Sequence, residues 1–262
     1  MTHKITRDLK YQVRNIHRLE FELSNNCQYS KVHKWCPASR DERPLTFLKS
    51  SIIHKVIDFF KQHDFYGIVY LSGYNEPLLD PRLIDIIKYI KANLPGGKVF
   101  MFSNGVACDE NILSDVIEAG VERFQLSVYN DKEYLRLREI AKKVPGVILR
   151  PRVVGNNDVD IDDRIKIYDE GTKGIGGYCY MPTLYYFVRN NGDVNMCNMD
   201  WKCTQIFGNL YKDSIESTIM NEERLRINSE LVDGNRGVLP VCKTCRLPGY
   251  KCTREYAKDL VL

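Results

Sequence analysis

The sequence lacks any apolar run approaching the roughly 18 residues that a membrane-spanning helix needs. Residues 1–18 are polar and charged, without the apolar stretch of a secretory signal. Charge of one sign is also scarce, because the formal net charge is only +4 and basic residues are scattered among acidic ones. These absences predict a cytoplasmic globular protein that binds neither a membrane nor a nucleic acid.

Cysteine, by contrast, is abundant. The chain has nine cysteines among 262 residues. Because disulfides are rare in the cytoplasm, cysteines in such number need another explanation, and metal binding is the leading one. The positions of the cysteines therefore guide the search for sites.

The first two thirds of the chain alternate between strand-like and helix-like segments. Repeated strand–helix units favour a parallel sheet with helices outside it. We predict an α/β fold in which residues 1–170 form a partial (β/α) TIM-like barrel of parallel strands. The expected strands are residues 17–23, 67–72, 98–103, 124–128 and 147–153, and the expected helices are residues 52–60, 83–90, 111–119 and 132–143.

The pattern changes near residue 170, where glycines cluster and cysteines become dense. Residues 185–189 and 194–197, joined by Asn191-Gly192-Asp193, predict a β-hairpin with a glycine-containing turn. We expect residues 171–262 to form a small Cys-rich C-terminal extension that contains this hairpin.

Polar and glycine-rich residues follow the ends of the expected strands. In barrels of parallel strands the chemistry lies at the carboxyl ends of the strands. A functional site is therefore expected on this rim. The segments concerned are Asn25-Asn26-Cys27 and Cys36-Pro37 after the first strand, Ser72 to Pro77 after the second, Ser103-Asn104-Gly105 after the third, and Ser127 at the end of the fourth.

Four cysteines surround the expected hairpin: Cys179, Cys197 and the CxxC pair Cys242 and Cys245. Four thiolates hold either a structural zinc ion or a 4Fe–4S cluster, and CxxC spacing lets two sulfurs converge on one metal site. The alternative is a set of buried free thiols. Two further cysteines, at positions 203 and 252, are extra ligands or ordinary thiols, and we favour thiols.

A second cysteine pair, Cys27 and Cys36, flanks a polar loop that contains His33. An iron–sulfur cluster with three protein ligands keeps one iron open for a substrate or cofactor. Histidine can replace cysteine on iron, and this raises the reduction potential. For His33, ligation and an exposed loop position are evenly balanced alternatives.

On these residues the sequence resembles the radical SAM superfamily. Members carry a loop after the first barrel strand, commonly CxxxCxxC, with an aromatic residue before the last cysteine. Here residues 24–27 look like the entry to that loop and Trp35-Cys36-Pro37 like its exit. His33 falls where the middle cysteine would be, and the span from Cys27 is two residues longer than usual.

The segments at the later strand ends strengthen the resemblance, which covers residues 17–155. The segment after the second strand resembles the glycine- and glutamate-containing motif that contacts the methionine amino group of S-adenosylmethionine (SAM). The turn after the third strand resembles the Thr/Ser-Asn-Gly turn of the family. The implied SAM-binding residues are Ser72, Gly73, Asn75, Glu76, Ser103, Asn104, Ser127, Arg150 and Arg152.

The tail resembles the SPASM/twitch extension of this family. Its marks are Cys179, the Gly-x4-Cys from Gly192 to Cys197, the following Gly208-Asn209 and the late CxxC. The short length favours the twitch form with one auxiliary 4Fe–4S cluster, similar in size and spacing to cyclitol-oxidising dehydrogenases of the family.

The resemblance implies that a 4Fe–4S cluster on the first loop binds SAM and cleaves it to a 5′-deoxyadenosyl radical, with electrons from a reductase or flavodoxin-type donor. The radical would abstract hydrogen from a substrate, and the auxiliary cluster would accept an electron. A two-electron oxidation of a small polar, sugar- or cyclitol-like molecule follows, which makes the protein an oxidoreductase. No catalytic base stands out in the sequence.

Two rival functions stay open. One is a radical SAM maturase of a ribosomal peptide, although only about 18 residues precede the first strand, too few for a separate peptide-recognition domain. The other is a non-catalytic iron–sulfur or zinc protein with a degenerate loop, which the missing third cysteine favours.

Overall fold

The computed structural model describes residues 6–31, 36–144, 146–151, 166–168 and 172–247. Within these ranges the strands form one sheet in the order β5-β4-β3-β2-β1-β6-β7-β8. Neighbours from β5 to β6 run parallel, while β6, β7 and β8 pair antiparallel. The strands are β1 Arg18–Phe21, β2 Gly67–Tyr70, β3 Gly97–Ser103, β4 Val121–Val128, β5 Val147–Pro151, β6 Tyr185–Val188, β7 Asp193–Asn195 and β8 Ile206–Asn209.

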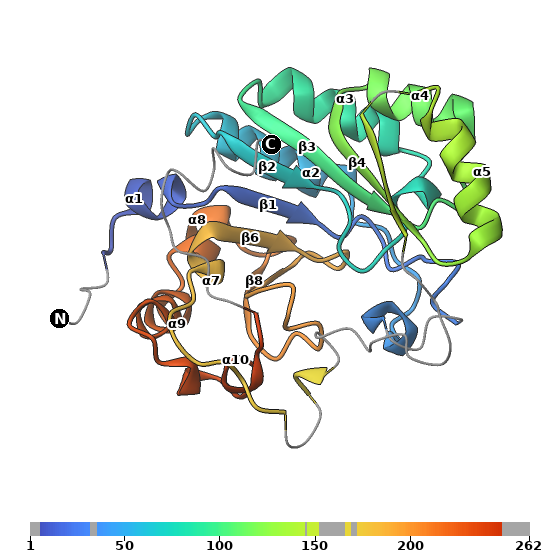
Figure 1. The fold of residues 1–262 in the computed structure, drawn as a ribbon. Helices are drawn as coiled ribbons and strands as arrows, with labels where there is room; N and C mark the ends of the chain where they lie inside the picture. Colours follow the sequence, from blue (N-terminus) through green and yellow to red (C-terminus); the bar gives the residue numbers. More distant parts are fainter. Residues whose placement is uncertain (1–5, 32–35, 145, 152–165, 169–171, 248–262) are drawn as a thin grey trace.

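Helices α2 to α5 connect the first five strands and cover one face of the sheet, and α8 packs into the same core. Helices α7, α9 and α10 lie below β6 in the view of Figure 1. The α-helices are α1 Leu9–Arg14, α2 Ser50–Lys61, α3 Leu83–Asn93, α4 Glu110–Glu118, α5 Asp131–Ala141, α7 Met181–Leu184, α8 Ile215–Ile219, α9 Glu222–Val232 and α10 Pro240–Thr244. Short 3-10 helices are η1 Pro37–Arg40, η2 Pro77–Leu79 and η3 Arg236–Val238. The expected α/β fold with a partial barrel of parallel strands is confirmed, and among the described residues the edge strands β5 and β8 do not pair with each other.

The main core lies between the sheet and α2 to α5. Helix α2 buries Ile53, Val56 and Ile57 at helical spacing, and β1 buries Leu19 and Phe21 at every second position. Side chains at the alternate positions of β1 point to the opposite, inner face of the sheet. That face is therefore free to carry polar groups, and the site described below is built on it.

The hairpin expected in the C-terminal part is confirmed as β6 and β7. Its turn contains Gly192 at a φ of +83°, a left-handed conformation that glycine adopts without strain. Strand β6 pairs with β1 over four residues, from Arg18 opposite Tyr185 to Phe21 opposite Val188. The C-terminal part thus continues the barrel sheet instead of forming a separate one.

A second, smaller core lies under the C-terminal part. It joins Tyr185 and Phe187 of β6 to Ile227 and Leu231 of α9 and to three buried cysteines. In the part of the chain that the structure describes, no helix is long and apolar enough to cross a membrane.

Candidate functional site

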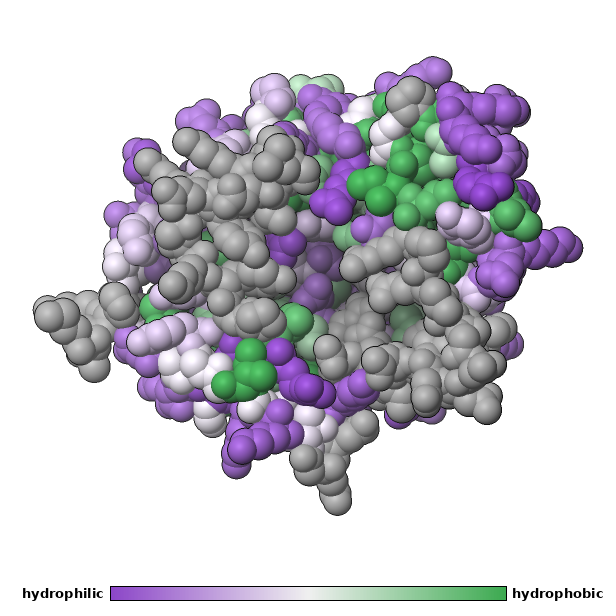
Figure 2. Space-filling view, in the orientation of Figure 1, coloured by the Kyte–Doolittle hydropathy of each residue, from purple (hydrophilic) through white to green (hydrophobic). Residues whose placement is uncertain are grey.

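A cavity of about 380 Å³ opens at the carboxyl ends of β1 to β4, within the size range of small-molecule sites. On the face seen in Figure 2, a hollow with hydrophilic side chains at its bottom lies near the centre. Every SAM-binding residue expected from the sequence whose side chain the structure describes lines this cavity. These residues are Ser72, Gly73, Asn75, Glu76, Ser103, Asn104 and Ser127.

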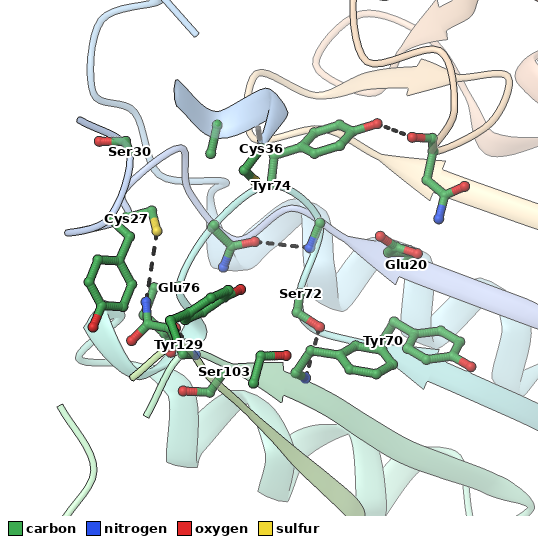
Figure 3. A pocket seen from close by; sticks show the side chains of 18 of the residues that line it. Glu20, Cys27, Ser30, Cys36, Tyr70, Ser72, Tyr74, Glu76, Ser103 and Tyr129 are labelled. Carbon is green, nitrogen blue, oxygen red and sulfur yellow. Dashed lines mark hydrogen bonds between the residues drawn. The ribbon is translucent and has the colours of Figure 1, made fainter. Parts of the chain in front are cut away.

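Cys27 and Cys36 line the same cavity. The Asn104 amide donates a hydrogen bond to the Cys27 sulfur at 3.8 Å (Figure 3). Burial raises the pKa of the Cys27 thiol to about 11, and Cys36 raises it further when it carries negative charge. Two thiols that interact in this way fit as two ligands of one cluster, because bound iron removes their protons. The third expected ligand, His33, lies outside the described residues.

The loop after β2 is shaped by its own polar residues. The Asn75 side chain accepts a hydrogen bond from the Gly73 backbone N–H at 3.0 Å, and the Ser72 hydroxyl accepts one from Phe102 at 3.1 Å (Figure 3). A β-carbon on Gly73 would lie 2.9 Å from the Glu22 β-carbon. Position 73 therefore excludes a side chain, because the loop packs closely against Glu22 there.

Glu76 is the buried carboxyl of this loop. It accepts hydrogen bonds from the backbone N–H groups of Asn104 at 2.7 Å and Leu78 at 3.1 Å. Burial raises its pKa to about 7, and these hydrogen bonds lower it only in part. A buried acid that borders a cavity favours a cationic ligand group, such as an ammonium. The cation stabilises the ionised carboxylate in place of the water that burial excludes.

The inner end of the cavity contains residues that sequence reasoning missed. Arg18 donates a hydrogen bond to the Tyr70 hydroxyl at 2.9 Å, and Glu20 accepts one from the Tyr185 hydroxyl. Figure 3 shows Glu20 and Tyr70 at the end of the cavity opposite Cys27. A signal for Arg18 and Glu20 existed, because they alternate with buried residues along β1 and so face the inner side of the sheet.

The four C-terminal cysteines converge on a second cavity. Cys179, Cys197, Cys242 and Cys245 line it together with methionine, valine, leucine and proline side chains. Negative charge on each of Cys179, Cys242 and Cys245 raises the pKa of the buried Cys197 thiol, after the larger effect of burial. The fold therefore brings Cys179 and Cys245, which are 66 residues apart in the sequence, to the same cavity.

Soft sulfur donors in an apolar setting suit an iron–sulfur cluster or zinc. Among the residues that the structure describes, no three His, Cys, Asp or Glu side chains are grouped closely enough to hold one metal ion. The Cys197 sulfur accepts a backbone hydrogen bond from Met199 at 3.5 Å, the kind of contact that tunes thiolate ligands. The four cysteines that line this cavity are the ligand type that an iron–sulfur cluster uses.

Cys203 and Cys108 do not line either cavity. Arg189 donates to the Cys203 sulfur at 2.7 Å in a separate groove. Cys108 is buried in the main core. Cys252 lies outside the described residues, as does Arg152. Arg150 pairs through its backbone with Ser127, on β5 next to β4.

The two cavities are adjacent. Met181 and Leu247 line both cavities, so these two side chains form part of the wall between them. Tyr74, in the loop after β2, donates a hydrogen bond to the backbone carbonyl of Asn198, the residue that follows Cys197 (Figure 3). The cavity with Cys27 and Cys36 is therefore in direct contact with the loop that carries one of the four C-terminal cysteines.

Comparisons with known proteins agree with this architecture. Residues 179–246 match the family model of the iron–sulfur cluster-binding domain SPASM, which confirms the resemblance seen in the tail. No curated protein sequence matches the chain.

Solved structures share the fold of the whole chain. BtrN in complex with AdoMet (SAM) and 2-DOIA superposes with a TM-score of 0.76 at 20% identity, covering 92% of this chain and 97% of BtrN. The SAM-bound structure of anSMEcpe superposes with a TM-score of 0.54 at 11% identity, covering 83% of this chain and 82% of that one. At these identities the likeness shows the fold alone.

Proposed function

We propose that this protein is a radical SAM oxidoreductase. In this proposal Cys27, Cys36 and His33 hold a 4Fe–4S cluster that binds SAM, and Cys179, Cys197, Cys242 and Cys245 hold an auxiliary 4Fe–4S cluster. When bound and reduced by one electron, the first cluster and SAM supply a 5′-deoxyadenosyl radical. The observation that supports the proposal is that Met181 and Leu247 line both cavities, because the first cavity then lies directly beside the proposed site of the auxiliary cluster.

The residues of the first cavity have distinct parts in this proposal. Glu76 in its ionised form holds the amino group of SAM, and Gly73, which lines the same cavity without a side chain, lets the methionine part approach the loop. Ser127, with Arg150 and Arg152, would hold the carboxylate or ribose. The inner end, with Arg18 and Glu20, is left for the substrate, and its charged and hydroxyl groups favour a small polar molecule.

The proposed reaction oxidises a secondary alcohol to a ketone. Methionine would leave when SAM is cleaved, and the resulting 5′-deoxyadenosyl radical would take the carbon-bound hydrogen as an atom to become 5′-deoxyadenosine. The hydroxyl hydrogen would leave as a proton, and an auxiliary cluster held by Cys179, Cys197, Cys242 and Cys245 would supply the acceptor for the remaining electron. One electron from a reductase or flavodoxin-type donor enters per SAM cleaved, so the balance closes.

BtrN is bound to AdoMet and 2-DOIA in its structure. The polar inner end of the cavity supports a small polar substrate for this protein. A peptide substrate is the main alternative, since anSMEcpe also has a structure with AdoMet and a Kp18Cys peptide. The proposal places the protein in the cytoplasm, where cysteine thiols stay reduced and can bind iron.

Anaerobic reconstitution with iron and sulfide, followed by assays for 5′-deoxyadenosine, tests the proposal. Cyclitols, aminocyclitols and a peptide panel serve as substrates, and mass spectrometry detects the loss of two hydrogens. We expect Cys27→Ala to abolish 5′-deoxyadenosine. Cys179→Ala should still form it but should give no oxidised product.

Several results would refute the proposal. Protein that binds two clusters but forms no 5′-deoxyadenosine is a non-catalytic metal protein, and zinc alone at both sites would exclude the clusters. If a peptide is oxidised and no cyclitol is, the protein is a peptide maturase and the proposed small-molecule substrate is wrong.

A further inference from the structure

Arg236 lies against the C-terminal cysteines without belonging to the set of ligands. It begins η3, its side chain is buried with 4% exposed, and it lines the cavity that the four cysteines share. Cys179, Cys242 and Cys245 line this cavity too. The guanidinium therefore lies beside thiols from both ends of the cysteine set.

The guanidinium also ties together the two chain segments that carry these cysteines. On one side its Nε donates to the Gly177 carbonyl at 2.9 Å and its Nη2 to the Tyr178 carbonyl at 3.0 Å. On the other side Nη1 donates to the Leu247 carbonyl at 2.9 Å and lies 3.5 Å from the Cys245 carbonyl. These bonds fix the charge in one position beside the cavity.

The other buried arginines have partners that Arg236 lacks. Arg189 pairs with the Glu22 carboxylate at 2.5 Å. The Arg224 guanidinium lies over the rings of Tyr186 and Phe207, at 5.7 and 5.5 Å from their centroids. In the described ranges, Arg236 has neither a carboxylate nor an aromatic ring as partner, and carbonyl oxygens alone accept its hydrogen bonds.

A buried charge without a counter-charge is unfavourable, so an anion is expected beside Arg236. Thiols lose their protons when they bind iron, so the cysteines around the cavity supply this anion once a cluster is bound. Four thiolates outweigh the positive charge of an iron–sulfur core, so a cluster at this site is net negative, and each electron it accepts makes it more so. A fixed cation at the edge of the site stabilises the reduced state more than the oxidised state.

We propose that Arg236 is the counter-charge of the auxiliary cluster and raises its reduction potential, so that the cluster accepts an electron from the substrate side more readily. The inference rests on the proposed ligand set of the auxiliary cluster. It does not depend on SAM cleavage or on the identity of the substrate.

The test compares Arg236→Gln, which removes the charge, with Arg236→Lys, which keeps it, in the full-length reconstituted protein. EPR-monitored redox titration gives the potentials of both clusters, and added SAM identifies the signal of the first one. We expect Arg236→Gln to disfavour reduction of the auxiliary cluster by about tenfold or more, which is about 59 mV for one electron. Arg236→Lys should stay closer to the parent, and the first cluster should not shift.

Arg224→Gln is the matched control, because Arg224 is also buried and bonded to backbone carbonyls but does not line the cavity. It should leave the auxiliary potential unchanged. An equal shift in this control, an unchanged potential in Arg236→Gln at full iron content, or an Arg236→Lys shift as large as that of Arg236→Gln would overturn the inference.

Cluster loss is also informative. If Arg236→Gln loses the auxiliary cluster while Arg236→Lys retains it, the charge is required and the inference stands. If both lose it, the carbonyl contacts matter and the charge does not, which overturns the inference. A parent protein without a second cluster overturns its premise, and assays for 5′-deoxyadenosine judge the proposed function separately.

Discussion

The hydroxyl of Tyr74 donates a hydrogen bond to the backbone carbonyl of Asn198. Tyr74 belongs to the loop after β2 that lines the first cavity, and Asn198 follows Cys197 in the second. The Arg189 guanidinium lies over the Tyr74 ring, 4.9 Å from its centre, and this cation–π contact helps to fix the ring. Two loops more than 120 residues apart in sequence are therefore joined at a single side chain.

Replacing Tyr74 by Phe removes this hydrogen bond and keeps the ring. We expect the free energy of unfolding to fall by about 1 kcal/mol, the usual value for one intramolecular hydrogen bond. The ratio of oxidised product to 5′-deoxyadenosine should also fall, because the Cys197 loop loses its tie to the substrate cavity. Tyr89→Phe, which loses an exposed hydrogen bond to Asp58, should leave the ratio unchanged. An unaltered ratio in Tyr74→Phe would show that the tie has no part in electron transfer.

Glu76 makes the stability of the metal-free protein depend on pH. Its pKa is about 7 in the folded protein against an ordinary value of 4.5, because burial disfavours the charged form. The folded state therefore holds the proton more tightly, and stability falls as pH rises from about 4.5 to about 7. The shift corresponds to about 3 kcal/mol.

The variant Glu76→Gln isolates this contribution, because glutamine does not titrate. Anaerobic urea unfolding of parent and variant at several pH values gives the difference in free energy of unfolding. That difference should change between pH 4.5 and 7 in favour of the variant and should be constant above pH 8. A difference that is independent of pH would mean that Glu76 titrates normally.

Much of the fold follows from local patterns in the sequence. The spacing of apolar residues predicted helix α2 and strand β1, whose apolar side chains are buried. The polar segments after each strand predicted the rim where Ser72 and Asn104 line one cavity. These patterns predict the site correctly because the carboxyl ends of parallel strands lie at one edge of the sheet. Residues that follow different strands are therefore close together in space. The spacing of the four C-terminal cysteines also predicted that they lie together, and they line one cavity.

Pairings across long stretches of sequence could not be predicted. Nothing local in Tyr185–Val188 indicates that β6 pairs with β1, because a fully buried strand has the same composition beside any neighbour. Helix α9 did have a signal, since Asn221 caps it ahead of two glutamates and buried Leu225. Arg236 had none, because its place is set by backbone carbonyls of two other segments, residues 177–178 and 245–247.

Glu22 is the centre of a buried ion network. Its side chain is fully buried and accepts from Arg189 at 2.5 Å, from Arg43 at 3.0 Å and from the Asn190 backbone at 3.2 Å. Glu22→Gln leaves the Arg189 charge buried without a counter-charge. We expect a loss of about 3–5 kcal/mol in the free energy of unfolding. The control Glu222→Gln breaks an exposed pair with Arg7 and should cost less than about 1 kcal/mol. Similar losses in both variants, measured by denaturant unfolding, would contradict the network.

Cys197 and Cys203 form a natural test of the ligand assignment, because they lie six residues apart and face different cavities. Cys197→Ser should remove the auxiliary cluster, with iron falling by about half and the SAM-sensitive EPR signal retained, because oxygen is a poor substitute for a thiolate on iron. Cys203→Ser should keep the iron content of the parent, since its sulfur is bonded to Arg189 away from the other cysteines. Iron and sulfide analysis of both variants, with Mössbauer spectra of the reconstituted proteins, decides the matter. Loss of iron in Cys203→Ser together with its retention in Cys197→Ser would reassign the fourth ligand to position 203.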